Sequence, residues 1–130
     1  MSIKPKAIPS VPKATKRVAQ AAFSKGNIYL QMRDELGELY TDDLFRDLYS
    51  SEGQPAFSPW RLALVMVMQF AENLSDRQAA DAVRARLDWK YALSLELTDI
   101  GFHYSILSEF RTRLVNHANG SLLLDVLLKR

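Results

Sequence analysis

The chain contains the stretch SPWRLALVMVMQFAEN at residues 58–73, which is apolar around almost its whole circumference. Ser58 is a preferred N-cap residue, and Pro59 suits the first helical position because its missing N–H would find no partner there. These signals predict a helix over Trp60 to Asn73. A helix that is apolar on all sides is typical of the buried centre of a bundle. A strand over Leu64 to Met68 is the alternative if the capping signal is ignored.

Shorter helical patterns lie on both sides of this stretch. Ile28, Met32 and Leu36 are spaced four apart, as on one face of a helix, and Ser75 with Gln78 forms a capping box. Besides the central helix, the expected helices cover residues 27–36, 42–49, 75–87, 88–95, 105–115 and 121–130. Because no convincing strand pattern accompanies them, the sequence predicts an all-α fold, a small multi-helix bundle.

Composition places limits on the function. The chain has 130 residues, 48% of them apolar and 25% charged, which fits one soluble domain. With no cysteine and two histidines, a disulfide scaffold, a Cys/His zinc site and a cysteine nucleophile are excluded. The five glycines are isolated, so no phosphate-binding loop is present. The longest apolar run, Leu62 to Phe70, is shorter than the roughly 20 residues of a membrane span, and no secretory signal is visible. We expect a cytoplasmic protein.

Charge is distributed unevenly along the chain. Residues 1–33 hold seven bases and no acid, whereas the remainder holds ten bases and fifteen acids. Together with three prolines, this predicts a flexible basic arm over residues 1–26, followed by a helical domain over 27–120 and the start of a further apolar helix over 121–130. The arm is interpreted either as a solubilising tail or as a segment that follows nucleic-acid phosphates.

Residues 74–93 show the order of a helix-turn-helix: a short helix, a tight break at Arg86 to Asp88, and a second short helix. Arg84, Arg86 and Lys90 are expected near its exposed end. An ordinary helical hairpin is the alternative, because the break lacks a glycine and Asp81 can pair with Arg77 or Arg84.

The order of several longer phrases resembles a known family. They are Arg33-Asp-Glu-Leu-Gly37, Gly53-Gln-Pro55, Pro59-Trp-Arg-Leu-Ala63, Gln69-Phe-Ala-Glu72, Leu74 to Leu93, Leu95-Glu-Leu-Thr-Asp99 and Ser108-Glu-Phe-Arg-Thr-Arg-Leu114. Over Tyr29 to Leu114 the chain resembles the N-terminal domain of bacterial insertion-sequence transposases of the InsH-like type.

The resemblance implies a role in DNA transposition. In that family the helical domain precedes a ribonuclease-H-like domain whose Asp-Asp-Glu carboxylates hold two divalent metals. The chain ends at Arg130, before the expected position of the first catalytic aspartate. We therefore expect a truncated or excised transposase with no catalytic residue, metal, cofactor or small-molecule substrate. Its expected partner is double-stranded DNA, at the terminal inverted repeats of the element, and its expected location is the nucleoid within the cytoplasm.

Three functions remain open at this point. The favoured one is a non-catalytic DNA-binding domain, with the arm on phosphates and a helix over 88–95 or 105–115 in the major groove. Its expected DNA-contacting residues are Lys13, Lys16, Arg17, Arg77, Arg84, Arg86, Lys90, Arg111 and Arg113. The second is a protein-interaction or homo-oligomerisation module without DNA binding of its own. The third is a complete transposase.

Overall fold

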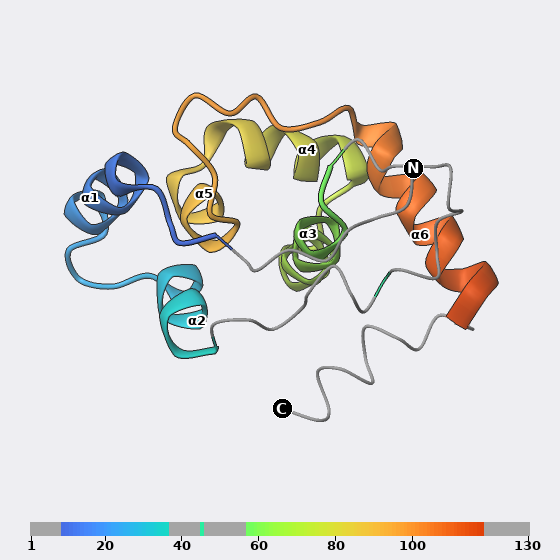
Figure 1. The fold of residues 1–130 in the computed structure, drawn as a ribbon, viewed down its shortest axis with the longest axis horizontal. Coiled ribbons are helices and arrows are strands. Elements are labelled where there is room, and N and C mark those ends of the chain that lie inside the picture. The colour runs from blue at the N-terminus through green and yellow to red at the C-terminus, as the bar shows by residue number, and fades with distance from the viewer. Residues whose placement is uncertain (1–8, 37–44, 46–56, 119–130) are drawn as a thin grey trace.

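The computed structural model describes residues 9–36, Phe45 and residues 57–118, which contain six helices and no strand (Figure 1). In chain order these are α1 (Lys13–Ala22), α2 (Ile28–Leu36), α3 (Pro59–Glu72), α4 (Asp76–Ala85), α5 (Leu87–Ala92) and α6 (Tyr104–Ala118). The all-α prediction is confirmed. The helix expected over 42–49, apart from Phe45, and the segment 121–130 lie outside the described residues.

Helix α3 lies at the centre of the bundle, as its sequence predicts (Figure 1). Pro59 is its first residue, and Asn73 ends it in a left-handed conformation with φ of 57°. The Ser58 hydroxyl makes no capping bond, because it accepts from the Arg61 guanidinium instead. The buried residues of α3 occur on several sides of the helix: Pro59, Trp60, Leu62, Ala63, Leu64, Val65, Met68 and Gln69. The strand alternative is wrong.

Helix α4 begins with the predicted capping box. The backbone N–H of Gln78 donates to the Ser75 hydroxyl at 3.1 Å, and the N–H of Ser75 donates to the Gln78 side chain at 2.9 Å. The buried face of α4 is made of small side chains, Ala79, Ala80, Ala82 and Val83. Small residues let helices approach closely, and α4 packs against α3, α5 and α6.

Helix α5 is an internal element. Every residue from 88 to 95 is buried, and α5 packs against α1, α2 and α4. Arg86 alone separates it from α4, and this residue has an extended backbone. A helix that reads DNA must be exposed, so the prediction that residues 88–95 enter the major groove is wrong.

The prediction of a flexible arm over residues 1–26 is wrong for Lys13–Ala22, which form α1. This helix docks on the bundle through Thr15 and Ala19, both fully buried. The Thr15 hydroxyl donates to the backbone carbonyl of Leu95 at 2.6 Å. The overlooked signal is the helical spacing of Val11, Thr15, Ala19 and Phe23, four residues apart, which forms a stripe able to pack on Leu30, Leu87 and Tyr91.

Candidate nucleic-acid interface

The nine predicted DNA-contacting residues fall into two groups in the structure, those exposed to solvent and those that contact the interior of the bundle. Six are exposed, and they lie on three helices: Lys13, Lys16 and Arg17 on α1, Arg77 and Arg84 on α4, and Arg113 on α6. The other three, Arg86, Lys90 and Arg111, lie wholly or partly inside the bundle. Exposure therefore favours α1, which carries three of the predicted cations close together.

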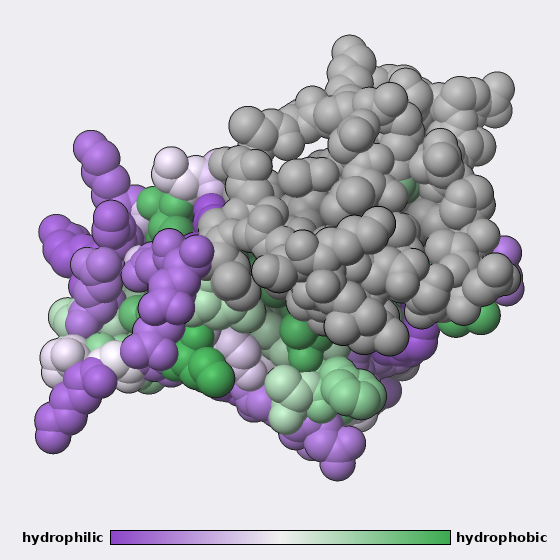
Figure 2. Space-filling model, turned by 90° about the horizontal axis from the view of Figure 1, so that it is seen from below, coloured by the Kyte–Doolittle hydropathy of each residue, from purple (hydrophilic) through white to green (hydrophobic). Residues whose placement is uncertain are grey.

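The basic face of α1 consists of Lys13, Lys16 and Arg17, on the side of the helix away from Thr15 and Ala19. None of the three cations forms an ion pair with a described residue, and no acidic residue occurs before Asp34. Figure 2 shows long hydrophilic side chains projecting from the left-hand end of the molecule, the end that α1 occupies in Figure 1.

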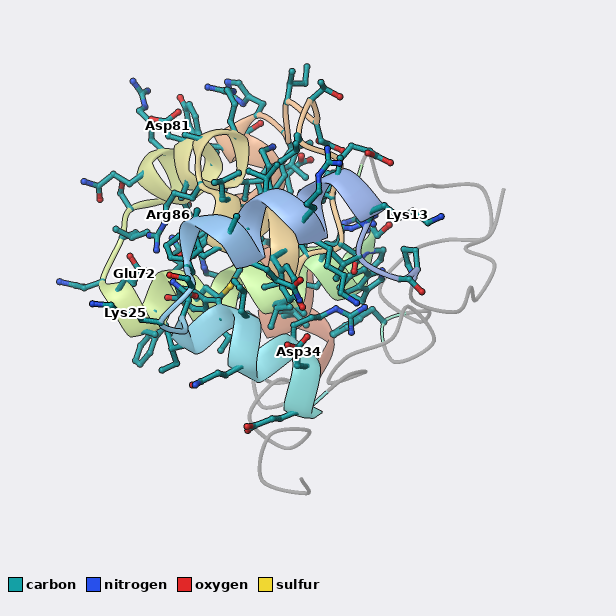
Figure 3. All side chains as sticks on the ribbon, turned by 90° about the vertical axis from the view of Figure 1, so that its left-hand side faces the viewer. Lys13, Lys25, Asp34, Glu72, Asp81 and Arg86 are labelled. Atoms are coloured by element: carbon teal, nitrogen blue, oxygen red, sulfur yellow. The ribbon has the colours of Figure 1, made fainter. Side chains whose placement is uncertain are left out.

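One further cation extends this surface beyond the helix. Lys25 is exposed in the connection between α1 and α2, and Figure 3 shows Lys13 and Lys25 near opposite ends of α1. Arg33, which belongs to the same basic segment of the sequence, is turned elsewhere. Its guanidinium donates to the Ser94 hydroxyl and to the Pro9 carbonyl, each at 3.0 Å. The positive surface is therefore built from α1 and Lys25.

Tyr91 packs against the buried face of α1. It is buried with Ala19 and Leu30 between α1 and α2, and its hydroxyl donates to the Asp34 carboxylate at 2.6 Å. Burial, followed by the bond to Asp34, raises the pKa of the Tyr91 hydroxyl. The basic face is thus mounted on a packed helix with a defined orientation.

Arg86 belongs to a structural network rather than to the surface. Its guanidinium makes two bonds to the Asp88 carboxylate, at 3.1 and 2.8 Å, and one to Glu72 at 2.6 Å. It also lies over the rings of Tyr29 and Trp89, at 5.8 and 5.2 Å from their centroids. The bonds to Asp88 and Glu72 raise the pKa of Arg86. This network joins α2, α3 and α5, and it engages all three nitrogens of the Arg86 guanidinium.

Lys90 is buried, which contradicts its predicted place at an exposed end. Only 3% of the residue is exposed, and its ammonium donates to the backbone carbonyl of Asp99 at 2.5 Å. Removal from water lowers the pKa of Lys90, since desolvation penalises the charged form. The residue fixes the loop between α5 and α6.

Arg111 connects α6 to the start of α4. Its guanidinium donates to both oxygens of Asp76, at 2.5 and 3.1 Å, and to Gln69 at 3.3 Å. The bond from Arg111 is the main reason that the pKa of Asp76 is lowered. On the same helix, Arg113 is exposed but has an interaction within the chain.

The exposed arginines of α4 also have partners. Arg84 pairs with Asp81 at 3.3 Å, which is one of the two pairings that the sequence allows for Asp81, and it donates to the Ile100 carbonyl. Arg77 lies 4.7 Å from the centroid of the Tyr104 ring and donates to the Tyr104 hydroxyl. The acidic partner of Arg84 makes this face less positive than that of α1.

An exposed apolar residue was missed by the sequence analysis. Phe70 of α3 is 89% exposed and borders a cavity of about 230 Å³. The cavity is also lined by Met66, Gln69, Asn73, Leu74 and Arg111. Because α3 is apolar on nearly every side, hydrophobicity alone could not distinguish its exposed positions from its buried ones.

Comparison with known proteins gives the family. The transposase domain family (DUF772) matches residues 17–113, about three-quarters of the chain. The chain therefore belongs to this transposase domain family. No curated protein and no solved structure matches it.

Neither a metal site nor a membrane-spanning helix occurs among the described residues. No group of histidine, aspartate and glutamate side chains there could hold a metal ion. No helix in the same ranges has the length and apolar character needed to span a membrane.

Proposed function

We propose that this transposase domain is a non-catalytic DNA-binding unit that recognises the terminal inverted repeats of an insertion sequence. The observation that supports the proposal best is the face of α1, where three exposed cations stand on a docked helix with no acid nearby in the sequence. DNA binding would place the protein in the nucleoid of the cytoplasm.

The charge pattern suits a polyanion. Duplex DNA carries one negative charge per about 1.7 Å of axis, and each phosphate that a cation neutralises releases condensed counterions. Lys13, Lys16 and Arg17 would contact neighbouring phosphates, with Lys25 as a fourth contact. Because α1 is already packed on α5, binding would not require a disordered arm to become ordered.

A salt titration tests the proposal. Three to four phosphate contacts predict that log K for a short duplex falls against log salt with a slope of about −3 to −4. Replacing Lys13, Lys16 and Arg17 together by Gln should reduce the steepness by about 3. Arg84→Gln is the matched control, since it removes an exposed cation from α4. The proposal fails if the triple variant keeps the wild-type slope.

The second candidate function is protein interaction through the surface around Phe70, and the exposure of that ring favours it. A second copy of the chain is the partner to test, because the exposed Phe70 ring borders a cavity that Met66 and Leu74 also line, and an apolar side chain from another molecule could enter it. The same salt titration distinguishes the two functions. An interaction module without DNA binding would show no salt-dependent binding to the duplex, and the triple Gln variant would behave as the wild type.

A further inference from the structure

We infer that α1 enters the major groove of duplex DNA and that Arg17 reads a guanine there. The inference rests on the proposed DNA binding and goes beyond it, because it moves Arg17 from a phosphate to a base. The phosphate contacts then fall to Lys13, Lys16 and Lys25, and the expected salt slope is about −3. Contacts to phosphates alone would carry no sequence information, whereas a base contact from α1 would make this helix the source of specificity.

Arg17 occupies the outermost position of α1. The helix turns through about 100° per residue, and the fully buried Thr15 and Ala19 define the direction toward the bundle. Arg17 lies about half a turn from the mean of these two positions. Its guanidinium is therefore carried on the crest of the helix, the part that would reach deepest into a groove.

The side chains on the two sides of Arg17 differ in size and charge, as expected for a helix in the major groove. Ala14 and Ala21 lie on one flank and are exposed, so no long side chain there keeps α1 away from base edges. Lys13 and Lys16 lie on the other flank and are also exposed, where they can reach phosphates. If α1 contacted only the DNA backbone, the small size of Ala14 and Ala21 would bring no advantage.

The chemistry of Arg17 selects the base. A guanidinium can donate two parallel hydrogen bonds to O6 and N7 of guanine, which is the commonest specific contact in the major groove. Among the described residues, the Arg17 side chain makes no hydrogen bond or ion pair. Docking through Thr15 and Ala19 fixes the direction of the helix, so the side chain is presented at a defined place.

Charge complementarity points to a duplex as the occupant. The residues up to Arg33 include no acid, so no carboxylate on α1 opposes approach to phosphates. An α-helix fits the width of the major groove of B-form DNA but not that of the minor groove. The partner class is therefore double-stranded DNA that contains a guanine at the site facing Arg17.

The experiment is selection of bound duplexes from a random library, followed by affinity measurements on the selected site and on a scrambled duplex. Arg17→Lys keeps the positive charge but loses the bidentate geometry. We expect about a tenfold loss of discrimination between the two duplexes, with little change in the salt slope. Wild-type protein should select a conserved guanine, and the variant should lose the preference at that position.

Ala21→Leu tests insertion by bulk alone. A larger side chain beside the crest should weaken binding to the selected site by about tenfold and spare the scrambled duplex, because the charge is unchanged. Ala22→Leu is the matched control, since Ala22 is also exposed but lies about 140° around the helix from Arg17. Thermal unfolding confirms that both variants remain folded.

The outcomes separate this inference from the proposed function. If no consensus is selected, or if Arg17→Lys and Ala21→Leu both discriminate as the wild type does, the groove assignment is wrong. The triple Gln variant would then still lose salt-dependent affinity if the proposed DNA binding holds. If that variant binds as the wild type does, the proposed function itself fails.

Discussion

The network around Arg86 shows how one side chain connects three helices. Its guanidinium satisfies the buried Asp88 carboxylate and the partly buried Glu72 carboxylate at once. Glu72 in turn accepts from the Tyr29 hydroxyl and the Trp89 indole. Removing the cation would leave two carboxylates close together with no positive partner.

We therefore predict that Arg86→Met lowers the free energy of unfolding by about 2–3 kcal/mol. This is below the roughly 3–5 kcal/mol of a fully buried pair, because the Arg86 side chain is 35% exposed and its bonds are screened. Urea denaturation measures the loss. The affinity of the folded variant for a short duplex should match that of the wild type. If the variant keeps full stability but loses affinity for DNA, Arg86 contacts DNA and its network is not needed for stability.

Sequence could identify these arginines and lysines but could not say which of them face solvent. Lys16 and Lys90 are both lysines in helices, yet one is exposed and the other is 3% exposed. The difference comes from partners far along the chain or in a loop, such as the Asp99 carbonyl that accepts from Lys90. Local ion pairs are the exception, and Arg84 with Asp81 could be predicted from spacing alone.

At the scale of an element, one buried hydroxyl contributes to the docking of α1. Thr15 donates to the Leu95 carbonyl, and Thr15→Val would leave this carbonyl buried without its partner. We expect a cost of about 1–2 kcal/mol that falls mainly on the docking of α1. Amide hydrogen exchange would detect it as roughly tenfold faster exchange in α1, with the central amides of α3 unchanged. Equal acceleration in both helices would show that α1 unfolds only with the whole domain.

Elements with strong local signals were predictable, and α3 and α4 begin where their capping residues indicate. Helix α1 was not recognised because its lysines and the nearby prolines suggested disorder, while the only buried residues within the helix are one threonine and one alanine. The resemblance to transposases was confirmed by the match to the transposase domain family over residues 17–113, whereas the InsH-like type stays a prediction. Burial of α5 could not be read from its own six residues, since two of them are charged.

At the scale of the whole molecule, the bundle has two different ends. Helices α1 and α6 lie at opposite ends of its longest axis, with α3 between them (Figure 1). The exposed cations of α1 are therefore separated from α6 and from the ion pair that Arg111 makes with Asp76. A duplex bound along α1 would leave the α6 end uncovered. This arrangement lets DNA binding and contact with another protein occur on the same domain.

We expect the ion pairs of Glu72 with Arg86 and of Asp76 with Arg111 to make the fold sensitive to acid. Bonds from Arg86 lower the pKa of the Glu72 carboxyl, and bonds from Arg111 lower the pKa of the Asp76 carboxyl. A carboxyl whose pKa is lower in the folded state stabilises the fold above its unfolded pKa of about 4, and the contribution is lost as pH falls through the folded value. We expect the free energy of unfolding to be level down to about pH 5 and to decrease below it.

The variant Glu72→Gln with Asp76→Asn tests the source of this decrease. It should be less stable than the wild type at pH 7, because Arg111 loses its anionic partner and Arg86 keeps only Asp88. It should also lose less stability between pH 5 and pH 3, since two carboxyls with lowered pKa no longer take up protons. Urea denaturation of both proteins across this range measures the two slopes. If the slopes are equal, the acid sensitivity arises from other carboxylates, and the contacts of Arg86 and Arg111 contribute packing and hydrogen bonds without a pH-dependent stability.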